Sequence, residues 1–141
     1  MQQRIAIVGG GIAGLTLAAA LDPGRFEVRV HEAQPERSAI GGALGMWPSA
    51  LRALARIGAR SAVEAAGGRP SVGALRAITG EPLAGGRLDL LMVPRPALLA
   101  ALRAALPGSV RVEHAEIADP AGLDADVVVG ADGVRSRVRG L

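Results

Sequence analysis

Three glycines near the start of the chain have the spacing of a phosphate-binding turn. Gly9, Gly11 and Gly14 form the pattern G-x-G-x-x-G. The first glycine permits a sharp turn, the second lets the backbone approach a pyrophosphate, and the third allows a helix to pack closely on a strand. Ile12 and Ala13 stand where that helix would begin, so its free N–H groups and positive dipole end would face the phosphates. The pattern predicts a dinucleotide site.

An acidic residue follows this turn at the distance expected for a ribose contact. Glu32 comes about twenty residues after the glycines. A carboxylate there accepts hydrogen bonds from the adenosine ribose hydroxyls, and it would repel a 2′-phosphate, which counts against NADP. The structural alternative is a simple tight turn, with Glu32 capping a strand. The full context favours an adenine dinucleotide, but these residues alone do not separate FAD from NAD.

A strand, a helix and a second strand must hold these residues. Residues 4–8 (RIAIV) form a short β-branched run, typical of a central parallel strand buried on both faces. Residues 12–21 are almost entirely apolar or small and predict a helix, which residues 22–24 (DPG) would end. Residues 26–31 alternate in polarity and predict the second strand. The N-terminal unit is therefore expected to be βαβ.

The rest of the chain continues the alternation of helices and strands. Residues 32–45 are expected to form a glycine-bearing connection, and Ser61 with Glu64 has the spacing of a capping box that opens a helix. Further helices are predicted at 48–57 and 96–106, and strands at 72–78, 88–93, 110–113 and 126–129. We therefore expect an α/β, Rossmann-like fold with a parallel sheet and a small strand insertion, as one domain over residues 1–141.

The composition argues against several other classes of protein. The chain lacks cysteine, and His31 and His114 have no local metal-ligand spacing, so no metal site is predicted. The net charge of +3 comes with only two aromatic residues, which argues against a nucleic-acid partner. The apolar run at residues 5–21 imitates a signal peptide, but glycines interrupt it. A cytoplasmic protein with a small-molecule partner and no membrane partner is expected.

A second motif near the end of the chain bears on the choice between FAD and NAD. Residues 126–139 read DVVVGADGVRSRVR, which resembles the DG motif of the flavin-dependent aromatic hydroxylases, the para-hydroxybenzoate hydroxylase-like family. The residues that match this motif are Gly130, Asp132, Gly133, Ser136 and Arg139. The resemblance implies FAD as the cofactor, contacted by Asp132 and Gly133 near its phosphate or ribose. A plain Asp-Gly turn is the alternative for this pair, and a helix-cap or loop role is the alternative for Ser136.

Two further segments resemble the same family in the same order. Residues 41–50 (GGALGMWPSA) resemble the segment after the ribose-binding acid, and residues 93–102 (VPRPALLAAL) resemble a segment in which an arginine contacts the cofactor. Arg95 takes that arginine's position, with a surface salt bridge as its alternative role. The resemblance implies a monooxygenase that inserts one oxygen atom into a small organic substrate, with NAD(P)H as reductant. No catalytic side chain is predicted, because the cofactor carries the chemistry.

The chain departs from this family in length. Members are well over twice as long, their later GD motif has no counterpart here, and residues 110–126 leave little room for extra strands before the DG motif. The expectation is a shortened N-terminal, FAD-binding portion of such an enzyme. Two alternatives stay open: a non-catalytic or truncated dinucleotide-binding module that lacks the substrate domain, and an NAD-dependent reductase.

Overall fold

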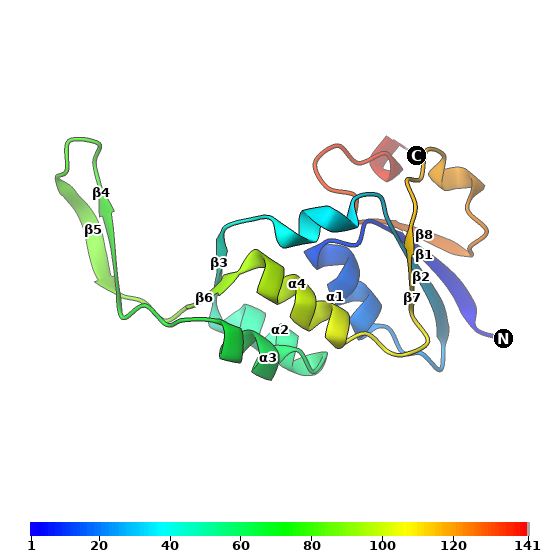
Figure 1. Cartoon of the computed structure of the whole chain (residues 1–141), viewed down its shortest axis with the longest axis horizontal. Helices are drawn as coiled ribbons and strands as arrows, with labels where there is room; N and C mark the ends of the chain where they lie inside the picture. Colours follow the sequence, from blue (N-terminus) through cyan, green and yellow to red (C-terminus); the bar gives the residue numbers. More distant parts are fainter. Residues whose placement is uncertain (141) are drawn as a thin grey trace.

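The computed structural model describes residues 1–140, with every side chain in that range except those at positions 37 and 38. Its four-stranded sheet is parallel, has the strand order β7-β2-β1-β8 and lies at the end of the molecule that carries the N-terminus (Figure 1). The bounds of these strands are β1 Gln3–Val8, β2 Phe26–Glu32, β7 Arg111–His114 and β8 Val127–Gly130. The expected α/β fold with a parallel sheet is confirmed.

The N-terminal unit is the predicted βαβ. β1 and β2 pair in parallel, and α1 (Ile12–Ala20) connects them. The β-branched residues of both strands, with Ile7 and Val30 fully buried, pack against Ala18 of α1 in one hydrophobic cluster. A strand buried this deeply must be apolar on both faces, which explains the uninterrupted run in β1.

A second hydrophobic cluster lies on the far side of α1. It is built by α2 (Pro48–Arg56), α3 (Arg60–Ala66) and α4 (Arg95–Ala104), and Leu15 of α1 joins it. α4 packs against both α1 and α3 (Figure 1). α4 therefore lies between the sheet unit and the remaining helices, where it can present side chains toward the sheet. None of the helices in residues 1–140 combines the length and the apolar composition that a bilayer crossing requires.

The strand insertion contains two strands, β3 (Ala43–Met46) and β5 (Pro82–Arg87), that the sequence did not predict. β3 forms within the segment that was expected to be an irregular connection, and it pairs antiparallel with β6 (Leu91–Pro94). β4 (Val72–Arg76) pairs with β5, and not with residues 88–93. All residues of β5 are exposed and two are glycines, so the segment lacks the apolar alternation that identifies a strand. β4 and β5 form a hairpin that projects away from the body of the molecule (Figure 1).

The predicted capping box is wrong. α3 begins at Arg60 with Ala59 as its N-cap and no side-chain cap, so Ser61 lies within the first turn of the helix. Glu64 bonds instead to the guanidinium groups of Arg60 and Arg69, each at 3.1 Å. The hydrogen bond from Arg60 has the largest effect on the pKa of Glu64. Together with the charges of both arginines and the bond from Arg69, it lowers this pKa. Two arginines offer a carboxylate stronger partners than a backbone N–H does.

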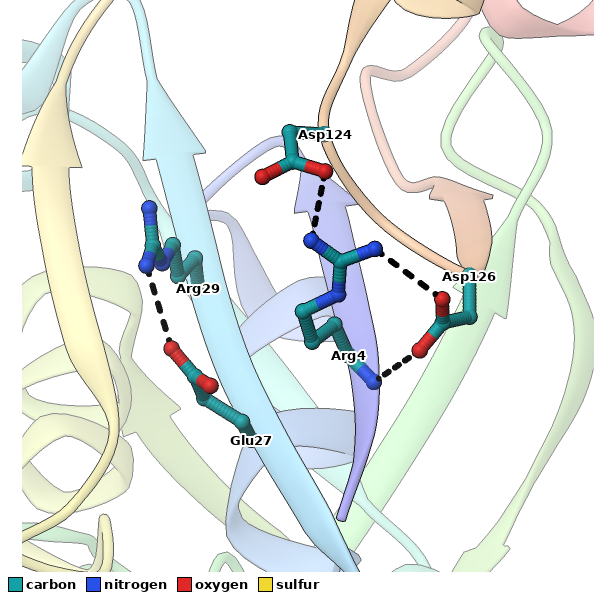
Figure 2. A network of polar contacts seen from close by, with 5 residues as sticks. All are labelled: Arg4, Glu27, Arg29, Asp124 and Asp126. Carbon is teal, nitrogen blue, oxygen red and sulfur yellow. Dashed lines mark hydrogen bonds and ion pairs between the residues drawn. The ribbon is translucent and has the colours of Figure 1, made fainter. Parts of the chain in front are cut away.

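A polar network fixes β8 beside β1 (Figure 2). The backbone N–H of Arg4 donates to Asp126 Oδ2 at 2.7 Å, and its guanidinium binds both Asp126 and Asp124. Nearby, Arg29 Nη2 donates to Glu27 on the same strand at 3.1 Å. Because Asp126 immediately precedes β8, this network sets the register in which β8 reaches the carboxyl end of β1 and delivers residues 131–133 to the glycine turn.

The same network predicts a pH dependence of stability. The hydrogen bond from the Arg4 backbone, followed by the bond from its guanidinium, lowers the pKa of Asp126 below the ordinary value of 3.8. A group whose pKa falls on folding stabilises the folded state above its unfolded pKa, and this stabilisation is lost as the pH falls through the folded pKa. We expect Asp126→Asn to reduce the loss of stability between pH 6 and pH ~3, measured by urea unfolding.

The control for this experiment is Glu81→Gln, which removes a carboxylate from the exposed turn of the hairpin. It should leave the acid side of the stability profile as it is in the original chain. Equal profiles for Asp126→Asn and the original chain would show that the Arg4 network does not couple to folding.

Candidate dinucleotide-binding site

A cavity of about 520 Å³ lies at the carboxyl ends of the parallel strands. Ligands of open parallel α/β sheets bind at this edge. Its walls come from five segments of the chain, at residues 8–11, 31–34, 95–103, 115–117 and 131–137. Of the predicted cofactor-binding residues, those that line it are Gly9, Gly11, Glu32, Arg95, Asp132 and Gly133.

Two glycines of the turn are required by the fold. Gly9 has φ of 110°, and a Cβ there would lie 2.2 Å from the carbonyl oxygen of Ala131. Its N–H donates to the carbonyl of His31 at 2.8 Å, which joins the turn to β2. Gly14 is buried, and a Cβ at this position would lie 1.9 Å from the carbonyl oxygen of Gly9. These contacts match the turning and packing tasks expected of the first and third glycines.

Gly11 differs from its neighbours because open space surrounds it. A Cβ at this position would meet no atom within 4 Å, and its φ of −79° and ψ of −169° are open to any residue. Gly11 is the N-cap of α1, and no side chain caps that helix end. The fold therefore does not explain this glycine, whereas a ligand that approaches the backbone does.

Ile12 and Ala13 do not line the cavity with their side chains. Ile12 packs against the second hydrophobic cluster and Ala13 is exposed. A contact from either residue would therefore come from the backbone N–H of the first turn of α1, as the sequence pattern predicts. Gly14 also lies outside the cavity wall and acts through packing.

Glu32 is fixed in place by backbone donors. Its Oε2 accepts the N–H of Gly10 at 2.8 Å, and its Oε1 accepts the N–H of Gln34 at 2.7 Å. Each carboxylate oxygen keeps a second lone pair for a ligand hydroxyl. A Cβ at Gly10 would lie 2.9 Å from Glu32 Cβ, so this glycine makes room for the acid. In the G-x-G-x-x-G pattern, position 10 can be any residue. The only sign of Gly10 in the sequence is therefore the run of three glycines at residues 9–11.

Asp132 organises the loop that follows β8. Its Oδ2 accepts the N–H of Arg137 at 2.7 Å and that of Val138 at 3.4 Å. Burial alone would raise the pKa of Asp132, but hydrogen bonds from the Ser136 hydroxyl and the Arg137 backbone outweigh it, and the pKa falls below 3.8. The buried Oδ1 has no hydrogen-bond partner among the described residues. This oxygen faces the end of β8, where a Cβ at Gly130 would lie 3.4 Å from it, so Asp132 contributes to the cavity wall by fixing the loop.

The other residues of the DG motif shape this loop. Gly133 has φ of 82°, which supports the predicted Asp-Gly turn. Ser136 Oγ accepts the N–H of Arg139 at 3.0 Å, so the cap role considered for this serine is confirmed. The turn and the cap keep the loop bent over the cavity wall.

Arg95 lies at the opposite wall, at the start of α4. Its Nη1 donates to the carbonyl of Ile40 at 2.7 Å, and its aliphatic stem lies against Gly41. The residue therefore connects α4 to the segment before β3 and also lines the cavity.

Several cavity residues were not identified from the sequence. Arg103 lies eight residues after Arg95, and Leu99 lies between them, so one stripe of α4 faces the cavity at a spacing of four. This spacing of four residues was the signal in the sequence that could have identified Arg103. Arg135, Arg137 and Glu116 also line the cavity, but only the loop conformations bring them there. Four arginines and three carboxylates thus share the wall, a mixture suited to phosphates and hydroxyls.

His31 is the one buried polar residue of the sheet in the described structure. Its Nδ1 lies 3.5 Å from Glu113 Oε2 on β7, across the β2–β7 pairing. The described residues contain no cluster of three side chains that could ligate a metal ion. The open approach to Gly11 and the lone pairs of Glu32 together fit the phosphates and ribose of an adenine dinucleotide.

Comparisons with known proteins agree with this geometry. A family model described as an NAD(P)-binding Rossmann-like domain matches residues 7–47. The chain is 35% identical over 161 residues to a 3-amino-4-hydroxybenzoate 2-monooxygenase of Streptomyces cremeus, with 96% of this chain and 41% of that protein covered. A shorter match, 34% identical over 62 residues, covers 44% of this chain and 16% of the FAD-dependent urate hydroxylase of Klebsiella pneumoniae subsp. pneumoniae.

The solved structures show the same relationship. The tetrameric form of 2-methyl-3-hydroxypyridine-5-carboxylic acid oxygenase superimposes with a TM-score of 0.85 at 32% identity, covering 99% of this chain and 42% of that one. The chain thus spans 41 to 42% of the length of these relatives. By sequence and by fold, the chain belongs to the family of FAD-dependent aromatic monooxygenases and corresponds to their N-terminal portion.

Proposed function

We propose that this chain binds FAD as the cofactor-binding portion of a flavin-dependent monooxygenase. The observation that carries the proposal is that the open backbone at Gly11, the fixed carboxylate of Glu32 and the Asp132–Gly133 turn line one cavity. The motifs that supply them lie at opposite ends of the chain, and parallel pairing of β1 with β8 brings them together.

In this proposal, each group holds a defined part of the cofactor. The backbone at Gly11 and the first turn of α1 would receive the pyrophosphate, and Arg95 would add positive charge on the facing wall. Glu32 would accept hydrogen bonds from the adenosine ribose, and Asp132 would hold the loop after β8 against the cofactor. A bound flavin would supply the redox chemistry, while the protein orients it and shields it from solvent.

The reaction assigned to the whole enzyme is transfer of one oxygen atom to a small organic substrate, with NAD(P)H as the reductant. The activities of the relatives support this class, since they are monooxygenases and oxygenases of hydroxylated ring acids. The proposal includes a cytoplasmic location and a small-molecule substrate, with neither nucleic acid nor membrane as partner.

Two other functions make different predictions. One is a non-catalytic dinucleotide-binding module, and the other is an NAD-dependent reductase, which the description of the matching family model favours. The test is an absorbance spectrum of the purified chain with and without added FAD, then denaturation to identify the released cofactor. Bound FAD would support the proposal, and a chain that ignores FAD but binds NAD would overturn it.

Turnover is a separate question from binding. Oxidation of NAD(P)H that depends on an aromatic acid substrate would support the monooxygenase activity for this chain. Bound FAD without such oxidation, under conditions in which a full-length relative is active, would support the non-catalytic module.

Glu32 provides a sharper test of the binding mode. Glu32→Gln places an amide N–H₂ opposite the N–H of Gly10 or Gln34, so one backbone bond and the ligand's charge-assisted bonds are lost. Hydrogen bonds to a charged group contribute about 1.5–3 kcal/mol, which predicts a loss of FAD affinity of roughly 10-fold to 100-fold. Isothermal titration calorimetry measures this loss.

The matched control is Glu36→Gln, at an exposed acid four residues further along the chain. This variant should bind FAD as tightly as the original chain does. Equal losses in both variants would point to a general charge effect and would contradict the specific role of Glu32.

A further inference from the structure

The two loops that flank the cavity come from opposite edges of the sheet. β7 and β8 are the outer strands of the order β7-β2-β1-β8, so three strand spacings, about 14 Å, separate them. The loop after β7 supplies residues 115–117 to the cavity wall, and the loop after β8 supplies residues 131–137. Between them lie the carboxyl ends of β1 and β2, which carry the glycine turn and Glu32.

One side chain joins these loops. Arg137 Nη2 donates to Glu116 Oε1 at 2.8 Å, and its Nη1 donates to the carbonyl of Ile117 at 3.2 Å. Its backbone N–H donates to Asp132 Oδ2 at 2.7 Å. In the described part of the chain, the hydrogen bonds found between the two loops both come from this guanidinium.

The contact is too exposed to be explained by stability. The side chains of Arg137 and Glu116 are 51% and 68% exposed, and ion pairs of this kind contribute little to folding. Both residues line the cavity, and the same arginine orients the carboxylate whose second oxygen has no partner. The geometry therefore indicates that Arg137 holds together the two loops that form the rim of the cavity.

We propose that Arg137 is a positioning residue that clasps the two loops over the bound dinucleotide and slows its release. This proposal rests on the proposed function, since it assumes that the cavity holds FAD. The guanidinium acts through Glu116 and Ile117, and the backbone N–H of Arg137 acts through Asp132, with no contact to the ligand required. A bound cofactor leaves when the clasp opens, so the strength of the clasp sets the dissociation rate.

The fork geometry of arginine is specific to this arrangement. Two nitrogen atoms of one rigid group reach a carboxylate and a carbonyl on the same loop, whereas the single ammonium of lysine presents a point charge on a flexible stem. We expect Arg137→Met to raise the FAD dissociation rate about tenfold, which corresponds to 1.4 kcal/mol, and Arg137→Lys to recover only part of this loss.

The test is stopped-flow fluorescence of FAD binding and release by the whole chain, with Arg111→Met on the exposed part of β7 as the control. Because the clasp is exposed, salt should screen it, so dissociation from the original chain should accelerate with ionic strength. Arg137→Met should already release FAD quickly and show a smaller salt dependence, since only the charges that hold the pyrophosphate remain to be screened. A double variant with Glu116→Gln should release FAD about as fast as Arg137→Met alone, since both changes remove the same contact.

The outcomes separate the clasp from the cofactor site. If the original chain binds FAD and Arg137→Met releases it at a rate within twofold of the original, with the same salt dependence, the clasp is overturned and the proposed function stands. If the original chain binds no FAD at all, the proposed function fails and the clasp fails with it. A melting temperature that changes little in Arg137→Met, together with faster release, supports positioning over a loss of fold.

Discussion

Gly11→Val is expected to abolish FAD binding, with at least a 100-fold loss of affinity, while the protein stays folded. The valine methyls would occupy the open space beside Gly11, through which the pyrophosphate must approach the backbone. The φ of −79° suits valine, so the substitution costs the fold no more than about 1 kcal/mol for a poorer N-cap. Calorimetric titration with FAD measures the affinity, and circular dichroism checks the fold.

A matched control for this change is Gly86→Val on β5. A Cβ at Gly86 also meets no atom within 4 Å, and this residue lies on the hairpin outside the cavity. The control should bind FAD as the original chain does. Unchanged FAD affinity in Gly11→Val would show that the pyrophosphate does not bind at this turn, and the assignment of the site would then be wrong.

Gly14→Ala should act in the opposite way from Gly11→Val, because it should destabilise the fold and not remove a contact with the ligand. Alanine in a helix interior usually stabilises by about 1 kcal/mol relative to glycine. Here its Cβ would lie 1.9 Å from the Gly9 carbonyl oxygen, a backbone atom held by the turn. Relieving this overlap requires α1 to move off β1, and we expect a loss of about 3 kcal/mol or more.

Urea unfolding followed by circular dichroism measures this loss of stability. Gly42→Ala is the control, because a Cβ there meets no atom within 4 Å and should change the midpoint little. A midpoint for Gly14→Ala at or above that of the original chain would show that helix propensity outweighs the contact, and that α1 lies further from β1 than described here.

The sequence alone predicted the parts of the fold that have a strong local signal. The uninterrupted apolar run of β1 and the glycine turn predicted the βαβ unit correctly, because burial on both faces requires apolar residues and positive φ favours glycine. β3 was missed because its four residues contain a glycine and its pairing with β6 depends on contacts almost fifty residues away. The exposed strand β5 carried no hydrophobic period to detect.

The candidate site also contains residues that the sequence predicted and residues that it did not. Glu32, Asp132 and Arg95 were found through motif spacing and resemblance, and the structure brings them to one cavity. Arg137 and Glu116 could not be paired from the sequence, because they are twenty-one residues apart and meet only through loops at opposite edges of the sheet. A contact of that kind is fixed by topology, which local residue patterns do not record.

The projecting hairpin has a practical consequence for work with this chain. Val72, Leu75 and Leu83 are each about two-thirds exposed, Ile78 is fully exposed, and neither outer edge of β4–β5 is paired with another strand in the described structure. Exposed apolar strands with open edges invite pairing between molecules. Concentrated solutions should therefore associate reversibly through this arm, and a single charged residue at Leu83 should keep the molecules apart without changing the dinucleotide cavity.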